Sequence, residues 1–151
     1  MFAKAALLVR CLAAFLVCSI SFSVEAQTFE ENKEMAEQGN VRAQFVIGGK
    51  YLRGEGVVQD YKQAFKWCMK AAEQGIHLAQ YSLGSMHGNG IGVVQDYVRG
   101  YMWFNLAAAN GYEDGWEARD SISKVMTSDQ IAEAQRMASE MVEANPKVMG
   151  E

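Results

Sequence analysis

The sequence has no cluster of lysine and arginine, few cysteines and no apolar run long enough to cross a membrane. Its 14 basic and 18 acidic residues give a net charge of −4. A mildly acidic chain without a basic patch argues against nucleic acid or an anionic membrane as its partner. Half of the 151 residues are apolar, which is enough for a sizeable core in one domain and argues against disorder over most of the chain.

The N-terminal segment has the pattern of a secretory signal peptide. Lys4 and Arg10 form a basic start, residues 12–20 form a short apolar core, and short side chains lead up to Ala26. The apolar run is too short for a membrane span, so we predict cleavage after Ala26 and a periplasmic or secreted location. Two alternatives stay open. The segment could remain as an N-terminal anchor helix, or Cys18 could be lipidated, although the residue before it is not small.

Cysteine is scarcer still after the predicted cleavage. Cys11 and Cys18 lie in the removed segment, so Cys68 is the single cysteine of the mature chain, whose net charge is −5. One thiol cannot form an internal disulfide, even in an oxidising compartment. We predict that Cys68 is an inert core residue, with a reactive or intermolecular thiol as the alternative.

What the sequence does have is an internal repeat of 36 residues. Residues 36–39 return at 72–75, and residues 54–61 return almost unchanged at 90–97. A gapless alignment of residues 36–71 with 72–107 contains 16 identities. A fixed period of this size indicates stacked units of secondary structure, each too small to bury its apolar face alone. Cys68 aligns with Phe104, in agreement with a buried position.

Apolar residues recur at helical spacing throughout the repeat. Asp60 and Asp96 stand where they can cap helices, and residues 127–130 have the pattern of a capping box. Gly48 and Gly84 fall in mid-helix at a cost of about 1 kcal/mol each, which indicates the close approach of another helix. The predicted helices are 30–38, 41–53, 61–74, 77–89, 97–110, 113–126 and 128–144.

These helices predict an all-α domain over residues 27–144. Its repeats lie at about 40–75 and 76–111, and its C-terminal capping helices lie at 113–144. Met35 is expected on the inner face of the first helix, and most aromatic residues, Trp116 among them, are expected in the core. Asn145 and Pro146 end the last helix, so the tail 145–151 is expected to be frayed.

No residue pattern predicts catalysis, a metal or a cofactor. His77 and His87 are ten residues apart and lack further ligands at metal-binding spacing. The glycine-rich residues 88–92 follow a predicted helix rather than a strand, so a connecting loop is favoured over a phosphate-binding loop. No serine lies in a nucleophile motif.

The repeat resembles the Sel-one-like repeat family of the tetratricopeptide-like superfamily. The matching pattern is Ala-Gln, Leu/Ile-Gly, Gly-x-Gly-Val-x-x-Asp-Tyr, Trp and Ala-Ala-x-x-Gly, read at 43–75 and again at 79–111. The resemblance implies an α/α right-handed superhelix of antiparallel helix pairs, with two full repeats and a degenerate C-terminal pair. It also implies a short secreted bacterial adaptor or scaffold rather than an enzyme. Some relatives carry paired cysteines in each unit, which this chain lacks.

First helices line the concave groove in that superfamily. Phe45 and Tyr81 would then be anchors and Arg42 and Arg53 rim residues of a groove suited to an extended or helical peptide. The alternative is that Phe45 and Tyr81 fill the space between neighbouring helices. The predicted partner-binding residues are Arg42, Phe45, Gly49, Arg53, Leu78, Tyr81, Ser85 and Asn89.

The sequence thus predicts a secreted or periplasmic adaptor that binds a protein or peptide on its concave face. It predicts no nucleic acid partner and no stable membrane insertion after cleavage. Two other functions remain possible from the sequence alone. One is a small cell-envelope hydrolase acting on a cell-wall or lactam substrate. The other is a structural repeat protein that forms homo-oligomers through its open ends.

Overall fold

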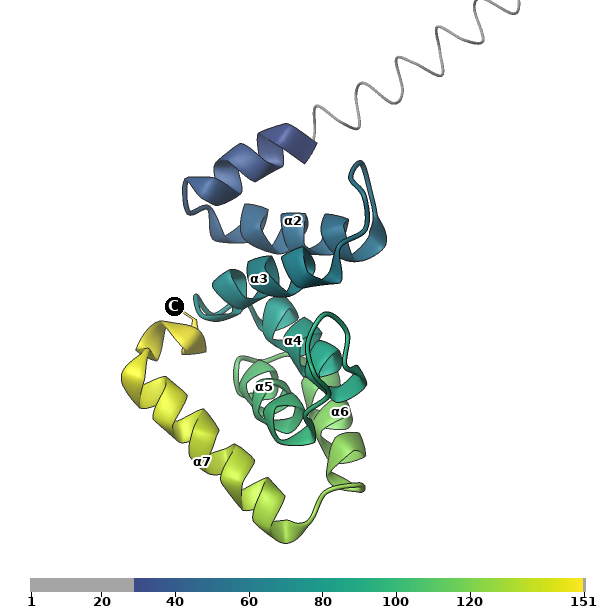
Figure 1. The fold of residues 1–151 in the computed structure, drawn as a ribbon. Coiled ribbons are helices and arrows are strands. Elements are labelled where there is room, and N and C mark those ends of the chain that lie inside the picture. Colours follow the sequence, from purple (N-terminus) through teal and green to yellow (C-terminus); the bar gives the residue numbers. More distant parts are fainter. Residues whose placement is uncertain (1–28, 151) are drawn as a thin grey trace, which may run out of the picture.

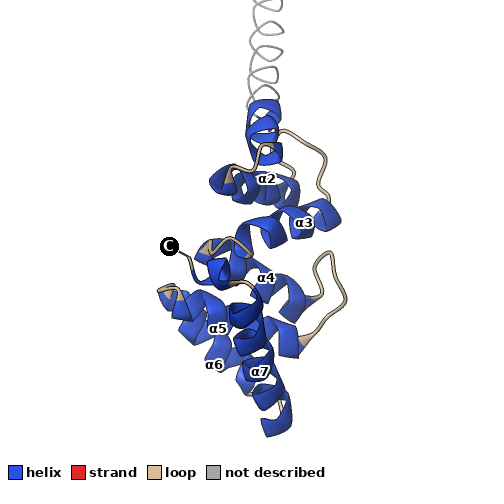
Figure 2. Cartoon of the chain, turned by 90° about the vertical axis from the view of Figure 1, so that its left-hand side faces the viewer, coloured by secondary structure: helices blue, strands red, loops and turns tan. Residues whose placement is uncertain are grey.

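A computed structural model describes residues 29–150, and every regular element in that range is helical (Figures 1 and 2). The predicted signal peptide and the cleavage site after Ala26 lie outside the described residues. The first described helix covers residues 29–37. The elements that follow are α2 (Val41–Arg53), α3 (Tyr61–Ala72), α4 (His77–Asn89), α5 (Tyr97–Ala109), α6 (Glu113–Ser123), α7 (Ser128–Ala144) and η1 (Pro146–Met149).

The predicted capping residues define the helix starts. The Asp60 carboxylate accepts hydrogen bonds from the first turn of α3, and Asp96 does the same for α5. Thr127 and Gln130 form the predicted capping box of α7. Four helices end earlier than predicted. The first helix, α3 and α5 run into glycine turns, and α6 loosens after Ser123.

The helices form an α/α solenoid in which α2 pairs with α3 and α4 pairs with α5. The second pair stacks on the first through α3 and α4 (Figure 1). The glycines predicted to admit a close neighbour do so. A Cβ atom on Gly48 would lie 2.8 Å from the sulfur of Cys68, and one on Gly84 would lie 2.5 Å from the ring of Phe104.

The period extends upstream of the first full unit. Phe29 packs edge-on against Tyr51 at 5.5 Å between ring centroids, and Phe65 packs edge-on against His87 at 5.4 Å. The two pairs are 36 residues apart in both members. Helix 29–37 is therefore equivalent to the second half of α3 and covers the open end of the first unit.

Helix α7 leaves the solenoid order, packs along α5 and returns towards the end of α3 (Figure 1). The sequence of α5 is consistent with burial of this face by α7. Val98, Met102 and Leu106 are half-buried or buried on α5, whereas the aligned positions on α3 are exposed lysines. The three lysines are Lys62, Lys66 and Lys70.

The prediction of a frayed C-terminal tail is wrong for residues 145–150. Val148 is 0% exposed, and its carbonyl accepts hydrogen bonds from Gln80 at 2.6 Å and Asn110 at 2.8 Å. Pro146 ends α7 as predicted, but it also begins the 3-10 helix η1. The tail is held because it satisfies two buried amides and fills an apolar site.

Several predictions of burial are also wrong, among them that of Tyr61, which is 44% exposed. Met35 is 43% exposed, because Phe29 and Ala36 form the inner face of the first helix. Trp116 is 48% exposed on α6, with the Arg119 guanidinium 4.5 Å from its ring. Among the described helices, none combines the length and the apolar character that crossing a membrane requires.

Candidate partner-binding surfaces

The exposed side of the first helices forms a surface that we call the A-helix surface. It comprises the outward positions of α2 and α4, which are the first helices of the two stacked pairs. Val46 is 40% exposed on α2 and Leu78 is 39% exposed on α4, so each helix presents one large aliphatic side chain. The A-helix surface consists of Arg42, Val46, Gly49, Arg53, Leu78, Ser82, Ser85 and Asn89.

The two predicted aromatic anchors lie beneath this surface. Tyr81 is half-buried and its ring contacts Phe104 at 5.4 Å and Tyr112 at 5.0 Å between centroids. Phe45, at the aligned position in α2, packs against the core. Both rings therefore contact neighbouring helices and turns of the chain, and on α2 the exposed position is one residue further on, at Val46.

Three of the remaining predicted residues line two separate hollows. Arg42 lines a hollow of about 350 Å³ with Val41, Gln74, Ile76 and Lys147.

At the other end of the surface, Ser85 and Asn89 line a hollow of about 380 Å³ beside Phe104 and Ile122. Arg53 forms an ion pair with Glu55 and covers Gly49. The structure thus places the predicted residues along one side of the first helices without bringing them into one pocket.

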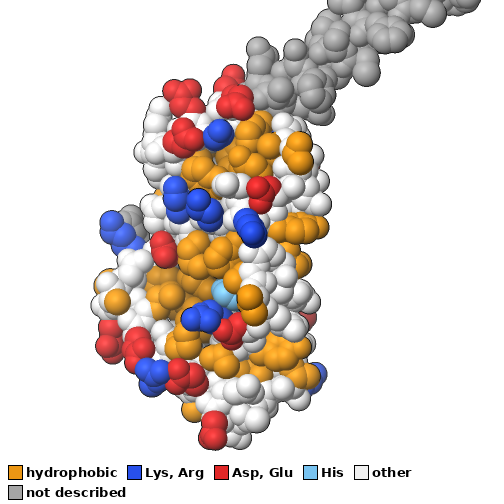
Figure 3. Space-filling view, in the orientation of Figure 1, with side chains coloured by type: hydrophobic (Ala, Val, Ile, Leu, Met, Phe, Trp, Pro, Cys, Tyr) orange, Lys and Arg blue, Asp and Glu red, His pale blue; other side chains and the backbone are white. Residues whose placement is uncertain are grey.

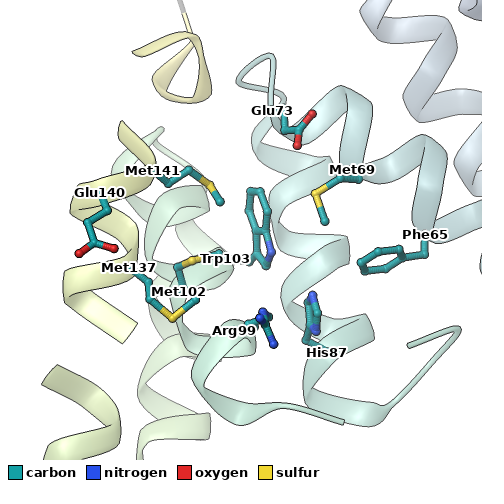
Figure 4. Close-up of a pocket in the computed structure, with 10 residues that line it drawn as sticks. All are labelled: Phe65, Met69, Glu73, His87, Arg99, Met102, Trp103, Met137, Glu140 and Met141. Atoms are coloured by element: carbon teal, nitrogen blue, oxygen red, sulfur yellow. The ribbon is translucent and has the colours of Figure 1, made fainter. Parts of the chain in front are cut away.

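A cavity that the sequence reasoning missed lies on the opposite side, between α3, α5 and α7 (Figures 3 and 4). Figure 3 shows apolar side chains gathered around a histidine, with charged side chains at the edges. The volume is about 450 Å³. Its lining includes four methionines from three helices, with Phe65 and Trp103, and the methionines are Met69, Met102, Met137 and Met141.

His87 lines this cavity without a polar partner of its own. The side chain is 4% exposed, and neither ring nitrogen forms a hydrogen bond. Burial lowers the pKa of His87 below its ordinary value of 6.5, while Asp96 opposes that shift and Arg99 supports it. The neutral ring therefore offers one donor and one acceptor that the protein leaves unused. In the first repeat this position is Tyr51, so the only sequence signal was a polar residue at an apolar position.

The other cysteine and histidine side chains that the structure describes, Cys68 and His77, lie outside this cavity. Burial raises the pKa of the Cys68 thiol to about 11, so the sulfur is protonated at neutral pH. His77 stacks on Tyr112 at 5.5 Å between centroids, far along α4 from His87. Within residues 29–150, the His, Cys, Asp and Glu side chains form no group of three that could hold a metal ion.

Comparison with known proteins identifies relatives of the repeat. The Sel1 repeat profile matches residues 41–76 and 77–112. A crystal structure of a protective antigen of uropathogenic Escherichia coli strains, which displays an SLR fold, is 35% identical with a TM-score of 0.77. That match covers 82% of this chain and 27% of the antigen, so this chain spans about a quarter of its relative.

A second solved structure is similar over most of its own length. It is a Sel1 repeat protein from Oxalobacter formigenes, 38% identical with a TM-score of 0.58, and the match covers 60% of this chain and 68% of that one. No curated protein sequence matches the chain.

Proposed function

This chain belongs to the Sel1 repeat family, and we propose that it is a secreted or periplasmic adaptor that holds a partner protein on its A-helix surface. A helical-repeat scaffold of this kind suits protein interaction. The proposal also draws on the resemblance of these first helices to those that line the concave groove in the superfamily.

The observation that carries the proposal is the pair of exposed aliphatic side chains on successive first helices. Val46 and Leu78 expose large apolar groups beside Arg42 on the same side of the solenoid. A central apolar contact with a polar and basic rim is the usual composition of a protein-binding surface. Partner surfaces with apolar residues and neighbouring carboxylates would complement it.

Site-specific crosslinking tests this surface directly. A photoreactive amino acid at position 46 or 78 should crosslink the same partner in living cells. The matched controls are positions 58 and 94, whose valines are 86% and 85% exposed and lie in the two equivalent loops. Replacing Val46 and Leu78 together by aspartate should abolish capture without loss of helical circular dichroism. Equal crosslinking from all four positions would refute the assignment.

The proposed location rests on the N-terminal pattern and has its own test. Cleavage after Ala26 predicts a mature chain that begins at Gln27, which intact-mass spectrometry of the envelope fraction measures. A chain that begins at an acylated Cys18 would replace this proposal with a lipoprotein.

The cavity around His87 supports a second candidate function, the binding of a small apolar molecule that carries one hydrogen-bonding group. Flexible thioethers adapt to varied ligand shapes, and His87 offers a donor and an acceptor in an apolar setting. An environment-sensitive apolar dye should become fluorescent with the wild-type chain and much less so with Met137→Glu. A dye signal that is the same with both chains would exclude this cavity as the binding site.

A further inference from the structure

The C-terminal tail occupies a site at the turn between α3 and α4. The Asn145 side-chain amide donates a hydrogen bond to the Glu73 carbonyl at 2.8 Å. The Val148 carbonyl accepts from Gln80 and Asn110, as described above. A Cβ atom on Gly75 would lie 2.4 Å from the backbone of Gly150, so this contact requires glycine. We call the groups that receive the tail, Glu73, Gly75, Gln80 and Asn110, the unit-two tail site.

The repeat builds the same site a second time, 36 residues earlier. Its members are Glu37, Gly39, Gln44 and Gln74, of which the first three are identical to their counterparts. We call this group the unit-one site. Gly75 and Gly39 both adopt positive φ, at 85° and 93°, so the two turns share their backbone conformation.

The hydrogen bonds within the two sites also match. Gln44 donates to the Ala36 carbonyl at 3.2 Å, and Gln80 donates to the Ala72 carbonyl at 3.1 Å. Gln74 donates to the Gln44 side-chain oxygen at 2.9 Å, and Asn110 donates to that of Gln80 at 2.8 Å. Gln44 is therefore already held by the same two contacts that hold Gln80, which binds the tail in unit two.

No described residue approaches Gly39 in the way that the tail approaches Gly75. A Cβ atom on Gly39 would have nothing within 4 Å, in contrast to Gly75. The second hydrogen bond of the Gln74 amide goes to the Lys70 carbonyl in the last turn of α3, whereas the second hydrogen bond of Asn110 goes to the tail. The third unit cannot form such a site, because Trp116 stands at the position of Gln44 and Gln80.

The surroundings of the two sites differ in charge. Leu106 lines a hollow with Met149 of the tail, and the position aligned with Leu106 is Lys70. Arg42 aligns with Leu78 and lines the hollow that also contains Gln74 and Lys147. An occupant of the unit-one site would therefore meet Lys70 at the position where the tail meets Leu106, with Arg42 at the neighbouring hollow.

We propose that the unit-one site binds a short segment of a partner protein that is shaped like the tail, Asn-Pro-x-Val, and carries an acidic residue after the valine. The asparagine would donate to the Glu37 carbonyl. The valine carbonyl would accept from Gln44, and from Gln74 once its amide exchanges the Lys70 carbonyl for the ligand. The acidic side chain would lie near Lys70. The repeat symmetry supports this occupant, and the site is separate from the A-helix surface except at its neighbour Arg42.

A labelled, end-blocked peptide, Asn-Pro-Ala-Val-Glu-Gly, tests the proposal by fluorescence polarisation with the chain purified from cells that express all 151 residues. We expect saturable binding to one site. Gln74→Leu removes the exposed amide and should weaken binding about tenfold. Lys70→Glu should weaken this peptide and strengthen its variant with lysine in place of glutamate. Lys62→Glu, two turns away on the same helix, should change neither.

Three outcomes would overturn the proposal. The first is no saturable binding, and the second is binding that Gln74→Leu leaves unchanged. The third is binding that is weakened by Asn110→Leu but not by Gln74→Leu. That result would show that the peptide displaces the tail from the unit-two tail site. Light scattering tests whether a second copy of the chain occupies the site. A dimer that the peptide dissociates would mean that the site binds the tail of the second copy rather than a partner protein. Val46→Asp with Leu78→Asp should leave peptide binding intact, so failure of either proposal is recognised separately.

Discussion

Replacement of Gly84 by alanine should destabilise the chain, although alanine is the better helix former. The added methyl would lie 2.5, 2.6 and 2.9 Å from three ring atoms of Phe104, closer than non-bonded carbons approach. Phe104 is 7% exposed and its ring is fixed against Tyr81, so it has little room to move. The pair of helices α4 and α5 would have to separate.

The expected size follows from two opposing effects. Overpacking of a well-packed core costs about 1–3 kcal/mol, and replacing a helical glycine by alanine returns about 1 kcal/mol. We expect a net loss of about 1–2 kcal/mol, since the clash is with a ring whose surroundings are closed. Gly88 on the same helix is the matched control. Its Cβ would meet only Ile122, at 3.5 Å, so Gly88→Ala should stabilise by about 0.5–1 kcal/mol.

Urea unfolding followed by helical circular dichroism measures both changes, with unchanged m-values as the check on the comparison. The two substitutions should shift the midpoint in opposite directions. A stabilising Gly84→Ala would mean that α4 and α5 are not held at the described separation, and the close packing of the second pair would be refuted.

Three further measurements check the tail, the thiol and the histidine. Val148→Ala should cost about 1.5–3 kcal/mol in urea unfolding, because the side chain is fully buried, whereas a frayed tail would give no change. Cys68, with a pKa of about 11, should react with iodoacetamide at least about 100-fold more slowly in the native chain than in denaturant. Stability should fall as the pH drops below about 6.5, because the unfolded chain binds a proton more readily than buried His87, and His87→Phe should reduce that slope.

The repeat itself made most of the fold predictable from the sequence. The period fixed the number of helix pairs, and the capping aspartates gave the starts of α3 and α5. Glycine at the same mid-helix register in both units indicated the close approach that the structure contains. Each of these features is local, so it can be read without knowing what the rest of the chain contacts.

Contacts made by elements outside the repeat were not predictable in this way. Met35 follows a helical pattern that fits two faces, and only the position of α2 decides which one is buried. The candidate cavity depends on α7 crossing α5, so Met137 and Met141 could not be placed beside His87 from spacing alone. The predicted anchors Phe45 and Tyr81 were one residue away from the outward positions, because a helix face includes both neighbours.

The positions at which the two repeats differ show which surfaces only one of the repeats buries. A position that is apolar in both units belongs to the shared core, whereas a position that changes from lysine to an apolar residue marks a surface that only one unit buries. Lys70 and Leu106 are such a pair, and the structure shows why. The C-terminal helix and tail cover Leu106 and leave Lys70 exposed. The same comparison identifies the unit-one site, since Gln44 and Gln74 keep the tail-binding groups while Lys70 replaces the apolar flank. A repeat that retains the hydrogen-bonding groups but reverses the character of their surroundings is suited to a different occupant, and that reversal is the reason to expect a carboxylate there.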